Sequence, residues 1–236
     1  TNRDIYLRSV EKKFCAPNSR MAMGKLFHGI VSDCIQSFRQ KQNLTFDTWW
    51  KKIRWHEIPE KPENVLDKCK QVWEFMHKMC DAQLSELSCS QPYASEMDLL
   101  STAVPFLVEH KLSGELLGLS DILSVDCFDY LRTIMFDLKV TSLKEDWHRL
   151  YSIGYALVFE SIHEVPVDIC CTVYLNVDNG KISVQKDLFF ANDELRQWWL
   201  EERDKKLELV AERKDPGKPD RSQCKEYCQY YNICYG

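Results

Sequence analysis

Hydrophobic positions in the first third of the chain recur at intervals of three and four residues, the spacing that puts side chains on one face of a helix. Between residues 19 and 40 this stripe consists of Met23, Leu26, Phe27, Ile30, Val31, Cys34 and Ile35. The same periodicity predicts helices over residues 1–18, 19–40, 45–54 and about 63–87. Pro62 precedes the last of these, at a position that suits a helix start. This part of the chain is expected to be mainly helical.

The pattern changes after residue 105. Apolar runs and alternation predict strands over Val108 to Val125 and over Thr133 to Val140. Residues 168–190 read as a hairpin, because Asp178-Asn179-Gly180 is a strong turn signal. Two more helices are predicted, over residues 142–163 and 192–213. Ser142 and Glu145 have capping-box spacing at the start of the first.

This order of elements predicts an α/β fold, in which a mixed sheet is flanked by helices. We expect one domain over residues 1–236, in three parts. Residues 19–105 would form a mainly helical subdomain, residues 106–190 a catalytic sheet and helix, and residues 191–236 a C-terminal helix and tail.

Composition limits the function classes. The hydrophobic fraction of 44% is that of a soluble globular protein. No apolar run approaches the roughly 20 residues that span a bilayer. The net charge of −5 gives no global attraction to nucleic acid, so any DNA contact must be local. The 11 cysteines are an odd number without a disulfide framework, which favours a reducing cytoplasm. Core packing explains several of them, namely Cys34, Cys69, Cys80, Cys170 and Cys171.

Three cysteines at the C-terminus stand closer together. Cys224, Cys228 and Cys234 follow Cys-x3-Cys-x5-Cys spacing. Thiolates at this density can hold zinc or an iron–sulfur cluster. Three ligands are one short of the usual four, so a metal site here would need a ligand from elsewhere. The alternative is a tail with unrelated cysteines.

Two short motifs carry the chemistry of a hydrolytic site. Asp137 and Lys139 alternate on one predicted strand and so share a face. A second carboxylate, from Asp121 in Gly118-Leu119-Ser120-Asp121, would complete a site for a hard cation such as Mg²⁺ or Mn²⁺. Such a cation assists phosphodiester cleavage, and the lysine can offset the developing charge. For Asp137 and Lys139 alone, a surface ion pair is the favoured alternative.

A histidine and an aromatic patch each have two readings. His28, in Gly24-x3-His28, is a further metal ligand or a partly buried helical histidine. Residues 49–55 cluster tryptophans with basic residues, which suits single-stranded nucleic acid. An amphipathic helix that buries its tryptophans is the favoured alternative there.

The order of these motifs resembles a known family more closely than any one motif does. Arg3 and Tyr6, then Gly24-x3-His28, Gly118-x2-Asp121, Asp137-x-Lys139, a helix with Tyr155 and the cysteine triplet follow one another along nearly the whole chain. The sequence resembles the RecB-like branch of PD-(D/E)xK nucleases. It is most similar to the CRISPR-associated RecB-like exonuclease of the adaptation module, in its type I-A variety.

The resemblance implies a restriction-endonuclease-like fold and a nuclease that cuts single-stranded DNA. It implies a Mg²⁺ or Mn²⁺ ion held by His28, Asp121, Asp137 and the Leu138 carbonyl, with Lys139 as the catalytic lysine. It also implies an iron–sulfur cluster on Cys224, Cys228 and Cys234, four-iron rather than two-iron, that staples the tail to the N-terminal segment. The implied partners are prespacer DNA overhangs, the CRISPR integrase and its small partner protein.

Two positions depart from the family pattern. Tyr151 stands where the family usually has a glutamine, and its role is packing or substrate contact. In the family, the fourth cluster cysteine lies just before the Arg-x-x-Tyr segment, which here would be upstream of Thr1. The alternative is that Cys15 replaces it. The register of Arg3 and Tyr6 favours the upstream position. Two other functions stay open, a RecB-like DNA-repair nuclease and a non-catalytic iron–sulfur protein that binds DNA beside the integrase.

Overall fold

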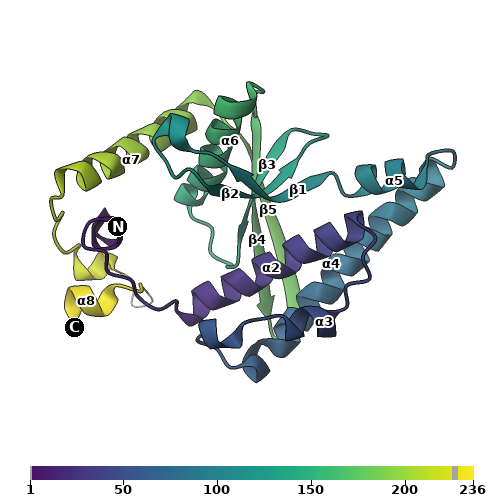
Figure 1. The fold of residues 1–236 in the computed structure, drawn as a ribbon, viewed down its shortest axis with the longest axis horizontal. Helices are drawn as coiled ribbons and strands as arrows, with labels where there is room; N and C mark the ends of the chain where they lie inside the picture. Colours follow the sequence, from purple (N-terminus) through teal and green to yellow (C-terminus); the bar gives the residue numbers. More distant parts are fainter. Residues whose placement is uncertain (1, 225–227) are drawn as a thin grey trace.

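The computed structural model describes residues 2–224 and 228–236 and builds one five-stranded sheet with helices on both faces (Figure 1). The strands are β1 Phe106–Leu112, β2 Leu123–Asp129, β3 Ile134–Lys139, β4 Ile169–Asp178 and β5 Lys181–Phe190. They lie in the order β1-β2-β3-β4-β5, and only the β3–β4 pair is parallel. The predicted mixed sheet flanked by helices is confirmed.

The helices fall into two groups along the chain. Those before the sheet are α1 Asn2–Ser9, α2 Ser19–Arg39, α3 Phe46–Lys51, α4 Pro62–Ser90 and α5 Glu96–Ala103. Those that follow β3 are α6 Arg149–His163, α7 Asp193–Glu212 and α8 Tyr231–Tyr235. Short 3₁₀ turns cover Trp55–Glu57, Glu115–Leu117, Asp146–His148 and Arg221–Gln223. The hydrophobic pattern missed α5, whose N-cap is Ser95.

Several predicted boundaries were wrong. The helix expected over residues 1–18 ends at Ser9. The stretch from Val108 to Val125 is two strands, because a loop at Gly114 and Gly118 turns the chain between them. Gly118 has φ +70°, which favours glycine. The capping box at Ser142 does not form, since α6 begins only at Arg149, after a 3₁₀ turn.

The two faces of the sheet carry separate cores. On one face, α2 and α4 run side by side, and α2 crosses in front of β4 and β5 in Figure 1. These helices bury Phe27, Ile30 and Val72 against Leu175. On the other face α6 covers β3 and β4, with Ile153 and Val158 among the buried residues. Burial of these apolar side chains is the main force that holds the helices to the sheet.

The aromatic patch at residues 49–55 belongs to the first core. Trp49 is buried, and the rings of Phe46, Trp50 and Trp73 pack around it at centroid distances of 5.8–6.4 Å. The tryptophans therefore pack inside, as the amphipathic-helix reading expected.

The N-terminal and C-terminal segments meet beside α7, at the lower left of Figure 1. Leu7, Tyr230 and Cys234 form a small buried cluster. The Tyr230 hydroxyl donates to the Lys13 carbonyl at 3.1 Å, and Arg3 pairs with Asp215 at 3.1 Å. Among the described residues, no helix has the length and apolar character to cross a membrane.

Candidate metal centre

His28 faces the sheet from the middle of α2. Its Nε2 atom lies 3.0 Å from the carbonyl oxygen of Leu138 on β3. A carbonyl can only accept a hydrogen bond, so Nε2 carries the ring proton in this contact. In the neutral imidazole, Nδ1 then keeps its lone pair. An oriented imidazole whose other nitrogen donates to a carbonyl is the usual arrangement of a histidine metal ligand.

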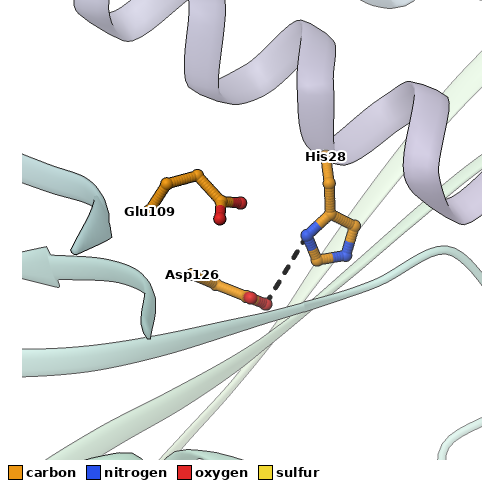
Figure 2. Close-up of side chains that lie close together, drawn as sticks. All are labelled: His28, Glu109 and Asp126. Carbon is orange, nitrogen blue, oxygen red and sulfur yellow. Dashed lines mark ion pairs between the residues drawn. The ribbon is translucent and has the colours of Figure 1, made fainter. Parts of the chain in front are cut away.

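Two carboxylates point toward the free nitrogen of this histidine. Among the described residues, His28, Glu109 and Asp126 are the group that brings potential metal-ligand atoms of three side chains within 4.8 Å of one another. Figure 2 shows them converging from α2, β1 and β2. Nδ1 of His28 is 3.7 Å from Oδ2 of Asp126, and the same oxygen accepts the Leu138 amide at 3.0 Å.

Glu109 is held in a backbone conformation that few non-glycine residues adopt. Its φ is +51°, although it lies inside β1. The pairing of β1 with β2 runs through Val108 and resumes at His110, so it is interrupted at Glu109. Unusual backbone of this kind costs of order 1 kcal/mol and gathers at functional sites. Here it accompanies a carboxylate that faces His28 and Asp126.

Asp137 and Lys139 extend the centre along β3. Lys139 Nζ lies 2.9 Å from Oδ1 of Asp137, and this ion pair is well shielded from solvent. The other oxygen of Asp137, Oδ2, is buried and has no hydrogen-bond partner among the described residues. An unpaired buried acceptor costs about 1–3 kcal/mol, so a ligand that binds it would recover stability.

The electrostatics of these carboxylates follow from burial. Burial raises the pKa of Asp137 to about 6, although the Lys139 ammonium opposes this. Burial also raises the pKa of Asp126, while His28, the Leu138 amide and Lys139 lower it. Tyr155 lies near the same charges, and burial followed by Asp126 and Asp137 raises the pKa of its phenol. The site crowds negative charge that a bound cation would neutralise.

The structure brings some of the predicted site residues together and leaves one apart. The structure brings together His28, Leu138, Asp137 and Lys139. Asp121 instead lies exposed in the bend before β2, outside the group that His28 forms with Glu109 and Asp126. Glu109 and Asp126 were missed. Because Cys127 pairs with Phe136 across the β2–β3 hairpin, the preceding Asp126 comes beside Asp137. Recognising that hairpin register would have found it.

The donor set suits a hard divalent cation. Carboxylate oxygens and one neutral imidazole are ligands of Mg²⁺ and Mn²⁺, whereas a soft ion would favour thiolates. The unpaired Oδ2 of Asp137 and the convergent carboxylates fit such an ion.

Comparison with known proteins shows the family of the chain. The family model for CRISPR-associated exonuclease Csa1 matches residues 1–236. The chain belongs to the Csa1 family. A protein of this description from Saccharolobus solfataricus is 30% identical over 70% of the chain. A second, from Thermoproteus tenax, is 22% identical over 99% of the chain. The matches cover 56% and 79% of these relatives' own lengths.

The C-terminal cysteines of this Csa1-family chain gather at the meeting of its termini. Cys15, from the N-terminal segment, and Cys228 both pack against the small cluster that Leu7 and Tyr230 form with Cys234. Burial, followed by the neighbouring Cys228 and Cys234, raises the pKa of the Cys224 thiol. The described residues thus include a fourth cysteine beside the expected three. A four-iron cluster is held by four thiolates, so this donor set suits one.

The remaining buried cysteines behave as apolar side chains. Cys34, Cys69, Cys80, Cys170 and Cys171 are all buried, as the sequence predicted. Burial raises the pKa of Cys80 to about 11 and that of Cys69 to about 12, so both stay neutral thiols.

Proposed function

We propose that this chain is a metal-dependent deoxyribonuclease of the PD-(D/E)xK class. The observation that supports it is the convergence of His28, Glu109 and Asp126, next to the Asp137–Lys139 pair. The family match supplies the reaction class, since the relatives are described as CRISPR-associated exonucleases. Asp126 takes the part that the sequence assigned to Asp121.

His28, Glu109, Asp126 and Asp137 would hold a Mg²⁺ or Mn²⁺ ion. When bound, such an ion polarises the phosphate and helps to form hydroxide from water. Leu138 acts on both sides of the site: its carbonyl fixes the His28 ring and its amide orients Asp126. Lys139 keeps two ammonium hydrogens beyond its bond to Asp137, and these can stabilise charge on a phosphate oxygen.

The test compares two isosteric variants on end-labelled single-stranded DNA with Mg²⁺ or Mn²⁺. Asp126→Asn should lower the cleavage rate about 100-fold or more, the scale of losing one preorganised electrostatic group. Asp121→Asn is the matched control and should cleave like the wild type. A calorimetric Mn²⁺ titration should lose the site in Asp126→Asn alone. The reverse result would restore Asp121 as the ligand. Cleavage by the wild type that resists chelator would reject the metal dependence, and absent cleavage would reject the nuclease.

We also propose that an iron–sulfur cluster, four-iron rather than two-iron, joins the ends of the chain. Cys224, Cys228 and Cys234 would supply three thiolates. Cys15 is the candidate for the fourth because it packs against the same buried cluster as Cys228, the cluster that contains Cys234. The cluster would tie the tail to the N-terminal segment, alongside the Arg3–Asp215 ion pair. Protein purified without oxygen should be brown and contain iron; stoichiometric zinc without iron would contradict this.

The proposed substrate is the single-stranded overhang of prespacer DNA, and the proposed partners are the CRISPR integrase and its small partner protein. A net charge of −5 gives the isolated chain little general attraction to DNA, so a partner must supply further phosphate contacts. The complex should therefore bind prespacer DNA more tightly than this chain, with a steeper salt dependence. Tight DNA binding by the isolated chain, without association with integrase, would favour the repair nuclease.

A further inference from the structure

Lys139 has a second neighbour besides Asp137. Its Nζ atom lies 3.5 Å from the centroid of the Tyr151 ring, on α6. The ammonium therefore contacts both a carboxylate of β3 and the face of an aromatic ring. Lys139 exposes 19% of its side chain, so it is largely removed from water. Tyr151 itself is 46% exposed, which is more than a role in core packing requires.

The contact has a clear physical effect. The face of an aromatic ring attracts a cation within about 6 Å of its centroid, and more strongly when both are shielded from water. A ring face accepts no proton and occupies no particular N–H direction. It can therefore fix the position of the ammonium while hydrogens remain for a phosphate oxygen. Asp137 alone would draw the flexible lysine toward the carboxylate.

We propose that Tyr151 is a positioning residue, which holds the Lys139 ammonium at the scissile phosphate through the face of its ring. The inference rests on the proposed nuclease function and deepens it. The aromatic ring positions the ammonium, and the phenol hydroxyl is not needed for this. This separates Tyr151 from the glutamine of the family pattern, whose side chain has no aromatic face.

The rate of cleavage in single turnovers with saturating Mg²⁺ tests the proposal. Tyr151→Phe keeps the ring and should cleave within about threefold of the wild type. Tyr151→Leu removes it and should be about 10-fold slower, within the range of cation–π contacts. DNA binding and the thermal midpoint should be similar in both variants. Equal rates for Leu and wild type would overturn the proposal, as would an equal loss in Phe and Leu.

A matched control is a second cation–ring pair, between Arg149 of α6 and Phe189 of β5. The Arg149 guanidinium lies 5.1 Å from the centroid of the Phe189 ring and donates to Asp187. Phe189→Leu removes a ring from a cation–ring pair without touching Lys139. It should leave the rate unchanged, and a loss equal to that of Tyr151→Leu would show a general packing effect instead.

A double-mutant cycle ties the effect to the lysine. In a Lys139→Met background, Tyr151→Leu should cause no further loss, because the cation it holds is already absent. An undiminished loss in that background would overturn the proposal.

An NMR measurement that does not depend on cleavage tests the Lys139–Tyr151 contact separately from the proposed nuclease function. The ε-methylene protons of Lys139 should show an upfield ring-current shift by NMR in the wild type and in Tyr151→Phe. Tyr151→Leu should abolish it. An inactive wild type with this shift would reject the nuclease and the catalytic use of the contact. An active wild type without it would overturn the positioning role alone.

Discussion

At Asp137, burial and ion pairing act in opposite directions, and burial prevails. The pKa of its carboxyl rises from 3.8 to about 6 despite the Lys139 ammonium. The folded state thus binds a proton at pH values where the unfolded chain has released it. The contribution to stability is complete below pH 3.8 and is lost as the pH rises to about 6.

We therefore predict how the metal-free protein responds to Asp137→Asn. The wild type should lose unfolding free energy relative to the variant between pH 4 and pH 7, by on the order of 2–3 kcal/mol. Urea denaturation at several pH values with chelator present measures this difference. A difference in unfolding free energy that does not change with pH would contradict the raised pKa of the buried Asp137 carboxyl.

Asp187 provides a control of opposite sign. Its carboxylate accepts two hydrogen bonds from Arg149, at 2.8 and 3.1 Å, and these hold its pKa below the usual range. The stabilisation that the ionised Asp187 carboxylate gives to the folded state is present at neutral pH and is lost as the pH falls. Asp187→Asn should therefore be most destabilising at neutral pH, and least so in acid.

The residue scale also shows what the sequence could supply. Asp137 and Lys139 were identifiable because a strand alternates its side chains. His28 was identified with two open readings. Glu109 and Asp126 depend on pairing between strands, and Asp126 stands five residues beyond the more conspicuous Gly118-x2-Asp121 motif. Neither the spacing of a motif nor the hydrophobic periodicity indicates which carboxylate will lie near a histidine on a helix distant in sequence.

At the scale of elements, two helix glycines differ in what surrounds them. Gly154 of α6 lies against the Trp199 ring of α7: an added Cβ would be 2.9 Å from Cε2 and closer still to Nε1. Gly24 of α2 has nothing within 4 Å of an added Cβ. The same substitution thus meets a packed helix pair in one case and open space in the other.

We predict that alanine has opposite effects at these positions. Gly154→Ala should destabilise by about 1–3 kcal/mol, because the Trp199 ring must move. Gly24→Ala should stabilise by about 0.5–1 kcal/mol, because alanine is the better helix former. Urea denaturation measures both. Stabilisation by both substitutions would mean that α7 does not pack on α6 at Trp199.

Elements were predictable where a long amphipathic pattern decided them, and their ends were not. The helix expected over residues 142–163 exists, but it starts at Arg149. Before it, Glu145 accepts a hydrogen bond from the Trp147 indole, and the His148 ring lies 3.2 Å from the Tyr174 hydroxyl. These contacts favour a 3₁₀ turn over the helix that the local capping signal predicted.

At the scale of the whole molecule, the two ends of the chain meet around four cysteines, three from the tail and Cys15 from the N-terminal segment. Arg3–Asp215 and Tyr230–Lys13 hold the same ends together without a metal. A cluster there would add to these contacts, because metal binding by the folded state alone becomes folding free energy. The sequence placed three of these cysteines, but left the source of the fourth ligand open between Cys15 and an upstream residue.

We predict that Cys15→Ser, in protein purified without oxygen, lowers the iron content, weakens the visible absorbance and lowers the thermal midpoint. Cys228→Ser should do the same, since it removes one of the proposed ligands. Cys89→Ser is the matched control, because Cys89 is exposed on α4 and should change none of the three. Iron analysis, absorption spectra and thermal melts of the four proteins decide the outcome. If Cys15→Ser keeps its full iron content while Cys228→Ser loses it, the fourth ligand is not Cys15. Joining of the ends by the cluster would then depend on a ligand other than Cys15.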